Sequence, residues 1–445
     1  MSLIDWEQRV IKRVDACKDE LVKLCSNLVR IPSYDRETRG EAESAHLVGR
    51  HLEQYKIPYE LFKSHPSIEN LVAALEGVKE GRRLLFNGHI DVVPPGSLDD
   101  WTVDPFGGEV KEGRVYGRGS VDMKGGVAAM TVALCVLKNL DVPLKGTVII
   151  NVVGDEERQG DLGTTWCINN IWEKIRADAS IVSEPTGTGT MGRTLCIGEK
   201  GPIWVKVTTK GRKAHGSVPL MGENAITRML RFLAALLDQE LPTVPPPLER
   251  EVLIQQIAGV MGMESAALES LLAKNGRLNF LHAVLEALTK TTLNVGTISG
   301  GVVANVVPDQ CEVELDFRIL PGQSPQTIPA FLHELARDLG LANAFEVEII
   351  SAFEGTSVPN FEADSLATTL LTTSRELAGP TIFFMATFAT DGRLLRKAGI
   401  SSTVVYGPGN GALAHQADEY ISIEEMITAT KVNALTAMRY LGIDE

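Results

Sequence analysis

One segment, Val148–Glu157, constrains the fold of this chain more than any other. It reads VIINVVGDEE, so a largely apolar run without alternation passes directly into three acids. Such a run is typical of a strand that is buried on both faces. Strands of this kind belong to sheets covered by helices on both sides, and ligands bind at the carboxyl ends of their strands. The acids at this strand end therefore indicate a site for a cation.

Strand and helix patterns alternate around this segment. Short apolar runs predict strands at 71–75, 84–86 and 179–182. Helical spacing, or an apolar character all round, predicts helices at 40–55, 127–137 and 164–175. The alternation predicts an α/β fold, a mostly parallel sheet with helices on both faces. A helix at 364–377, a strand at 403–406 and a last helix at 423–441 complete this predicted domain.

The pattern changes after residue 192. Residues 203–209 alternate between apolar and polar side chains, as in a half-buried antiparallel strand. Further elements are predicted as helices at 224–237 and within 265–288, and as strands at 293–298 and 311–319. We therefore expect a first domain made of residues 1–192 and 355–445, and an α+β domain, residues 193–354, inserted into it.

Length and composition limit the classes of protein. With 445 residues, the chain is long enough for two or three domains. No run of about 18 apolar residues is present, so no membrane segment is expected. The first 24 residues are charged and amphipathic, unlike a signal peptide, which predicts a cytoplasmic protein. Six scattered cysteines predict reduced thiols. A formal charge of −14 argues against nucleic acid or an anionic membrane as a partner.

Side chains that can bind a metal follow one predicted strand after another. They are His89, Asp91, Asp122, Glu156, Glu157, Glu184 and His415. Because the carboxyl ends of parallel strands meet at one edge of the sheet, these side chains should converge. Mixed histidine and carboxylate ligands suit zinc, or cobalt and manganese, better than calcium or magnesium. The set predicts two divalent ions bridged by one carboxylate, with a carboxylate left over as general base.

Five segments, in order, carry a resemblance to a known family. They read GHIDVVP (88–94), GRGSVDMKGG (117–126), GDEE (154–157), SEPT (183–186) and GPGNGALAHQADEY (407–420). Together they closely resemble the M20 family of metallo-aminoacylases and peptidases, and among these the acetylornithine deacetylase and succinyl-diaminopimelate desuccinylase branch. The resemblance implies a catalytic domain of the zinc-peptidase type with two zinc ions per chain. It also implies hydrolysis of the amide bond of an N-acyl amino acid.

The resemblance assigns roles position by position. It implies metal ligands for one zinc at His89 and Glu184, for the other at Glu157 and His415, and a bridging ligand at Asp122. Glu156 matches the general base, Asp91 matches the acid that orients the metal-bound histidine, and the peptide bond between Asp122 and Met123 should be cis. Taken singly, these residues have ordinary alternatives: a structural or surface histidine, a solvated acidic turn, or a capping acid before proline.

The inserted domain resembles the family's lid, which commonly forms a homodimer. GRKAHGSVP (211–219) matches the segment whose histidine, here His215, stabilises the oxyanion, commonly across the dimer interface. GGVVANVVP (300–308) and DFRIL (316–320) match segments whose Asn305 and Arg318 would bind the substrate carboxylate. The alternatives are an exposed histidine, a turn asparagine and a surface ion pair. TDGR (390–393) has no assigned role, and the stretch 248–289 is longer than in the shorter family lids.

Two other functions remain open from the sequence. One is a dipeptidase or carboxypeptidase of the same family, which would use the same metal site on a peptide-like substrate. The other is a binding or scaffold protein that has kept the fold without activity. The second would be expected to have lost a ligand or the base, and this sequence retains all of them.

Overall fold

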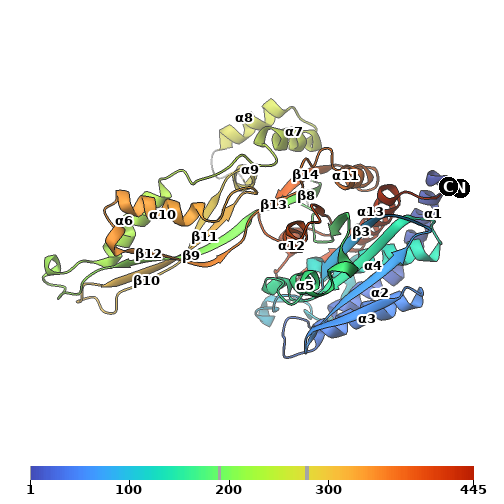
Figure 1. Ribbon diagram of the computed structural model, residues 1–445, viewed down its shortest axis with the longest axis horizontal. Helices are drawn as coiled ribbons and strands as arrows, with labels where there is room; N and C mark the ends of the chain where they lie inside the picture. The colour runs from blue at the N-terminus through green and yellow to red at the C-terminus, as the bar shows by residue number, and fades with distance from the viewer. Residues whose placement is uncertain (1, 189–191, 276–279, 445) are drawn as a thin grey trace.

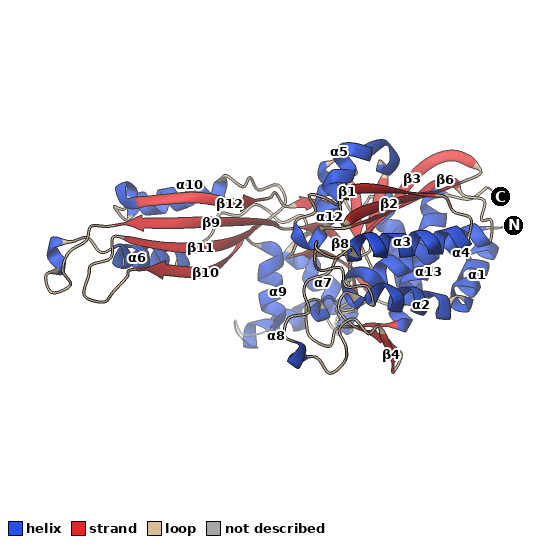
Figure 2. Ribbon diagram, turned by 90° about the horizontal axis from the view of Figure 1, so that it is seen from below, coloured by secondary structure: helices blue, strands red, loops and turns tan. Residues whose placement is uncertain are grey.

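The computed structural model describes residues 2–188, 192–275 and 280–444. It has a large α/β domain, from which an elongated arm extends (Figure 1). The two chain termini lie side by side at the end of the large domain that is opposite the arm (Figures 1 and 2).

The large domain is built on a nine-stranded sheet whose centre is parallel. The four central strands, all parallel, are β6 (Lys145–Val153), β3 (Lys79–His89), β7 (Ala179–Val182) and β15 (Ser402–Val405). The outer strands are β1 (Tyr59–His65) and β2 (Ile68–Glu76) at one side, and β8 (Arg193–Glu199), β13 (Thr356–Ser357) and β14 (Thr381–Ala386) at the other. The predicted α/β fold with a mostly parallel sheet is confirmed.

Strand β6 is buried on both faces, as its sequence predicts. Val148, Ile150 and Val152 pack into the core cluster on one face of the sheet. Ile149 and Val153 pack into a separate cluster on the other face. Each of these side chains has no exposed surface. The absence of polar alternation in VIINVV therefore reflects two apolar layers on opposite sides of one strand.

Helices cover both faces of this sheet. The larger layer contains α1 (Leu3–Ala16), α2 (Lys18–Val29), α3 (Gly40–Gln54), α4 (Gly125–Asn139), α11 (Ser365–Ala378) and α13 (Ile423–Leu441). The other layer contains α5 (Thr164–Ile175) and α12 (Asp391–Lys397). Within the described residues, Ser120–Asn139 is the one helical segment that is long and apolar enough to cross a membrane. Its apolar window is 94% buried, as in the core helix of a folded domain.

The arm is a four-stranded antiparallel sheet with helices on one face. In spatial order its strands are β10 (Thr292–Gly300), β11 (Gln310–Ile319), β9 (Gly201–Lys210) and β12 (Phe345–Ala352). The helices are α6 (Ala225–Leu237) and α10 (Thr327–Asp338), and they share one apolar core with the sheet. The strands run lengthwise along the arm (Figure 2), so one end of the sheet adjoins the large domain and the other is a distant tip.

Two parts of the predicted insert, 193–354, pack with the large domain. Strand β8 hydrogen-bonds to β14 and β15 in the nine-stranded sheet, and the four-stranded sheet begins only at Gly201. Helices α7 (Arg250–Met261), α8 (Ser265–Asn275) and α9 (Phe280–Thr289) contribute Leu253, Leu268 and Leu285, respectively, to the core of the large domain. Within the stretch 248–289, helix α7 thus lies beside β14 of the large domain.

Other local features were not expected from the sequence. The amphipathic N-terminal segment forms two helices that meet at Cys17. The glycine-rich region 94–119 contains β4 (Glu109–Lys111) and β5 (Arg114–Tyr116), which pair with each other and with β16 (Tyr420–Ser422). Strand β14 and helix α12 were not predicted. Each element is short, and most of its residues are buried, so its sequence shows no alternation between apolar and polar residues.

Candidate active site

The candidate ligands converge where three central strands end. His89 is the last residue of β3 and pairs in register with Val153, the last residue of β6. Asn87 of β3 pairs with Val182, the last residue of β7. Glu156 and Glu157 follow β6 in a single turn of 3-10 helix, and Glu184 follows β7. Parallel pairing therefore places these side chains at one edge of the sheet.

The first group of metal-competent side chains contains His89, Asp122 and Glu184. One donor atom from each lies within 4.8 Å of the others. His89 Nε2 is 3.1 Å from Asp122 Oδ1 and 3.3 Å from Glu184 Oε1. The His89 and Glu184 side chains are almost fully buried, so their donor atoms face an enclosed site.

The second group contains Asp122, Glu157 and His415, again with donor atoms within 4.8 Å. His415 Nε2 is 3.0 Å from Glu157 Oε1 and 3.4 Å from Asp122 Oδ2. Asp122 is common to both groups, with Oδ1 towards His89 and Oδ2 towards His415. One shared carboxylate, with one histidine and one further carboxylate on each side, is a donor set that fits two zinc-like ions.

Burial and neighbouring charges shift the pKa values of several groups in the cluster. Burial raises the pKa of Glu184 to about 8, with the charge of Asp122 adding to the effect. Burial also raises the pKa of Glu157. Hydrogen bonds to Asp122 and Glu157 raise the pKa of His415 to about 10. A cation bound among these side chains would favour the charged form of the carboxylates and offset the cost of their burial.

Glu156 belongs to neither group, although it lies beside them. Its Oε2 is 4.0 Å from His89 Nε2. Burial raises the pKa of Glu156 well above its usual range, against the opposing charge of His89 and with the repulsion of Glu184. A buried carboxyl group with a raised pKa, next to but outside the ligand groups, has the properties of a proton acceptor and donor.

Asp91 contacts both His89 and the two glutamates. The backbone N–H groups of Glu156 and Glu157 donate to its two carboxylate oxygens, at 3.1 and 3.0 Å. Nδ1 of His89 lies 3.0 Å from the Asp91 carbonyl oxygen and 3.5 Å from its carboxylate. The structure therefore brings Asp91 to the histidine that it is predicted to orient, and adds the glutamate turn as a second contact.

Asp155, the first acid after β6, faces away from the ligand groups. It has a positive φ of 67° and is fully buried. Its carboxylate forms an ion pair with Arg36 and accepts the N–H of Leu162 at 3.0 Å. Asp155 therefore shapes the turn that carries Glu156 and Glu157. No sequence pattern indicated Arg36, because it lies 119 positions from its partner.

The peptide bond between Asp122 and Met123 is cis, as the family resemblance implies. It lies immediately before α4, the helix that packs under the sheet. Two charged residues near this turn, Arg118 and Glu419, are also buried, and the sequence assigned them no role. Their one sequence signal is that they are charged residues inside the two glycine-rich motifs that carry Asp122 and His415.

The structure does not bring His215 and Asn305 to this site within one chain. His215 follows the distal end of β9, a strand whose ten residues span about 30 Å at roughly 3.3 Å each. At the tip, Gly216 N–H donates to the Asn305 carbonyl at 2.7 Å, and Ser217 Oγ lies 2.7 Å from His215 Nδ1. His215 and Asn305 are therefore neighbours of each other, and both are exposed.

Arg318 lies at the opposite end of the arm, near the large domain. It pairs with Pro202 in the register of β11 and β9. Its Nε and Nη2 donate to the two carboxylate oxygens of Asp316 at 2.9 and 3.0 Å. The guanidinium is thus already engaged bidentately, in the geometry that a substrate carboxylate would use.

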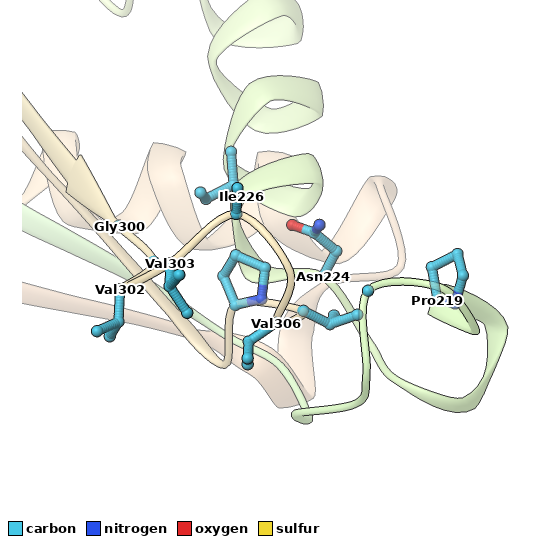
Figure 3. Close-up of a pocket in the computed structure, with 12 residues that line it drawn as sticks. Pro219, Asn224, Ile226, Gly300, Val302, Val303 and Val306 are labelled. Atoms are coloured by element: carbon cyan, nitrogen blue, oxygen red, sulfur yellow. The ribbon is translucent and has the colours of Figure 1, made fainter.

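The arm tip also carries a hollow of about 460 Å³, formed by the loop after β10 and the start of α6 (Figure 3). Asn224 and Ile226 lie on one side of it, and Val302, Val303 and Val306 on the other. The described residues that line it carry no ionisable side chain. This hollow therefore offers no acid or base for catalysis.

Residues 85–439 match the model of the peptidase family M20/M25/M40. This chain belongs to that family. The match includes every candidate ligand in both groups, from His89 to His415. The resemblance seen in the five sequence motifs is confirmed.

Relatives of this M20-family chain include probable succinyl-diaminopimelate desuccinylases. One from Staphylococcus aureus is 26% identical over 429 residues, which is 95% of this chain and 98% of the relative. The succinyl-diaminopimelate desuccinylase of Methylorubrum extorquens is 41% identical over 175 residues, 38% of this chain and 44% of the relative. The protein is therefore a metal-dependent amide hydrolase.

Solved structures share the fold over nearly the whole chain. An M20 family metallo-carboxypeptidase from Sulfolobus solfataricus has a TM-score of 0.72 at 21% identity and covers 95% of this chain and 99% of its own. The di-peptidase Dug1p of Saccharomyces cerevisiae has a TM-score of 0.71 at 16% identity, with 98% of each chain covered. A dinuclear metal binding peptidase of the family from Bacillus subtilis has a TM-score of 0.66 at 15% identity, covering 97% and 100%.

Proposed function

We propose that this M20-family hydrolase is a dinuclear zinc enzyme that removes the acyl group from an N-acyl amino acid of the succinyl-diaminopimelate or acetylornithine type. The observation that carries the proposal is the position of Asp122. Its two oxygens face two different histidines, each with its own second carboxylate. The names of the full-length relatives support the choice of an acyl-amino acid as substrate.

The metal ligands in this proposal are His89, Asp122, Glu157, Glu184 and His415. Bound there, two zinc ions would act as Lewis acids on the scissile carbonyl and lower the pKa of a water molecule. Cobalt or manganese would suit the same nitrogen and oxygen donors. The Asp91 carbonyl would accept the Nδ1–H of His89, which would keep the ring in place and leave Nε2 free to bind a metal.

Glu156 is the proposed general base. It accepts the proton of the attacking water, and the same carboxyl group then returns that proton to the leaving amine. Its burial and raised pKa support both steps, since a carboxyl group in this environment can hold a proton near neutral pH. Asp91 fixes its backbone through the N–H of Glu156.

A homodimer would complete the site. His215 lies at the arm tip, beyond the reach of the ligands of its own chain in this structure, so we propose that it stabilises the oxyanion of the partner's reaction. The tip exposes Leu220, Met221 and Val302 at 98, 68 and 96%, which supports an interface there. Asn305, which lies beside His215 at the tip, is proposed to contact the substrate carboxylate from the partner, and Arg318, at the near end of the arm, from the same chain. A cytoplasmic location stays a prediction.

A panel of substrates tests the proposal. The metal-free enzyme would be reconstituted with zinc, cobalt or manganese and assayed on N-succinyl and N-acetyl amino acids and on dipeptides. We expect turnover of acyl-amino acids that depends on about two ions per chain. Preferential hydrolysis of dipeptides would instead favour the dipeptidase or carboxypeptidase alternative, and full activity with one ion would contradict the dinuclear site.

A further inference from the structure

Arg118 and Glu419 form a buried ion pair close to the second ligand group. Arg118 Nη1 is 2.6 Å from Glu419 Oε2, and the two residues are 2 and 1% exposed. The guanidinium also lies over the ring of Trp101, at 5.2 Å. A buried pair of this kind loses much of its Coulomb energy to desolvation, so the other contacts that it makes matter for its role.

Glu419 holds the backbone from which Asp122 extends. Its second oxygen, Oε1, accepts the N–H of Val121 at 2.9 Å and that of Asp122 at 3.2 Å. Both amides belong to the short turn before α4, in which Asp122 and Met123 have non-helical dihedral angles. The carboxylate therefore fixes the start of the side chain that is shared by the two ligand groups.

Arg118 holds the backbone on the other side of the same group. Its Nη2 donates to the His415 carbonyl at 3.3 Å, and its Nη1 donates to the Gln416 carbonyl at 3.1 Å. His415 has a positive φ of 64°, which is unfavourable for a residue with a side chain, and that side chain is 48% exposed. A ligand in a strained and exposed loop needs an external restraint to keep its position.

We infer that the Arg118–Glu419 pair is a positioning element that sets the spacing between Asp122 and His415, and so the affinity of the second ligand group for its ion. This rests on the proposed dinuclear function. The pair contacts the backbone of two of the three ligands in the second group, but only Asp122 in the first. Loss of the pair should therefore weaken the second site more than the first.

The test measures metal binding by metal-free full-length protein, with cobalt(II) titrated by calorimetry and visible absorption. The second step is here the one that belongs to the second ligand group, identified as the step that His415→Ala abolishes. Arg118→Met and Glu419→Met should each weaken this step by about 10–100-fold, the usual effect of removing a partner behind a ligand. The first step should change much less. The visible spectrum of cobalt should change at the step that His415→Ala abolishes, because that step reports the geometry of the His415 site.

A matched pair of double variants separates positioning from stability. Arg118→Met with Glu419→Met, and Arg118→Met with Glu419→Gln, both replace the ion pair with neutral side chains, which removes the unpaired charge of the single variants. Only glutamine retains a carbonyl oxygen that can accept the N–H of Asp122. We expect tighter binding at the second step with Glu419→Gln than with Glu419→Met.

Arg396→Met is the control for losing a buried ion pair elsewhere. Arg396 Nη1 is 2.7 Å from Glu199, both side chains are nearly fully buried, and neither contacts a ligand. This variant should lower stability and leave both cobalt affinities unchanged. If Arg118→Met and Glu419→Met bind both ions as the unaltered protein does, the inference is overturned. If the unaltered protein itself binds fewer than two ions, the proposed function fails instead.

Discussion

At the scale of single residues, the acids after β6 have separate environments. Asp155 is buried in an ion pair with Arg36 and shapes the turn. Glu157 lies 3.0 Å from His415 in the second ligand group, whereas Glu156 is held beside both groups and outside them. Asp91 therefore holds one backbone turn that places one glutamate inside the second ligand group and the adjacent glutamate outside both groups.

Exchanging each glutamate alone should cause different failures. Glu156→Gln is expected to keep its metal and to lose turnover by about 10²–10⁴-fold, because the proton acceptor is removed. Glu157→Gln is expected to lose an ion, because a neutral amide replaces a charged ligand. Metal analysis and steady-state kinetics on both variants check this. Equal metal loss in the two variants would contradict the assignment.

Asp91→Ala removes the acceptor for two backbone N–H groups and the carboxylate near His89. We expect kcat to fall by about 10–100-fold, together with weaker metal binding at His89. The measurement is kinetics at saturating zinc, with circular dichroism to show that the fold is intact. Asp91→Asn, which retains one acceptor oxygen, should be impaired less than the alanine variant.

At the scale of elements, the junction between the sheet and the arm depends on one lysine. Lys200 lies between β8 and β9 and is 1% exposed. Its Nζ donates to the carbonyls of Ala287 and Lys290, at 2.9 and 2.6 Å, and to Thr292 Oγ1 at 3.1 Å. It therefore ties the junction to the end of α9 and the start of β10.

Burial lowers the pKa of Lys200 from 10.5 to about 7. Between these values the unfolded chain binds a proton that the folded chain does not, so the free energy of unfolding should rise with pH. The contribution of Lys200 to the free energy of unfolding should grow by up to about 1.4 kcal/mol per pH unit above pH 7 and should level off near pH 10.5. In Lys200→Met, this rise of the unfolding free energy with pH should be absent. Urea unfolding of both proteins at several pH values tests it, and parallel pH profiles would contradict it.

At the scale of the whole molecule, the arm separates residues that the proposed reaction needs together. His215 follows the distal end of β9, whereas the ligand groups lie at the ends of β3, β6 and β7. Strand β9 belongs to the arm and β3 to the large domain (Figure 1). Arm residues and α7–α9 come from one continuous insert, yet only the arm projects, while α7–α9 pack on the large domain. A second copy of the chain is the simplest source of a His215 that reaches the ligands.

Mixing two inactive variants tests this arrangement. His215→Ala and Glu156→Gln dimers should each be nearly inactive. After unfolding and refolding together, half of the dimers would be mixed, and each would have one complete site, so about a quarter of the activity should return. Activity that stays at the level of the separate variants would show that His215 does not act on the partner. His333→Ala, away from both sites, serves as the control and should remain active.

The positions of the ligands were predictable because parallel strands place their carboxyl ends at one edge of a sheet. His89, Glu157 and Glu184 each follow a buried apolar run, and that pattern is local in the sequence. The alternation of strands and helices predicted the sheet, because that pattern too is local in the sequence. Strand β14 and helix α12 escaped prediction, because a short buried element has no periodicity to mark it.

The α/β fold, the set of metal-competent residues and the family were predictable from the sequence, because strand burial and short motifs are local properties. Three features became visible in the folded chain: Asp122 faces both histidines, α7–α9 pack on the large domain and not in the arm, and His215 and Asn305 meet far from the metal groups. It also joined Arg118 to Glu419, 301 positions apart. Contacts of this range depend on how whole elements pack, which no local pattern records.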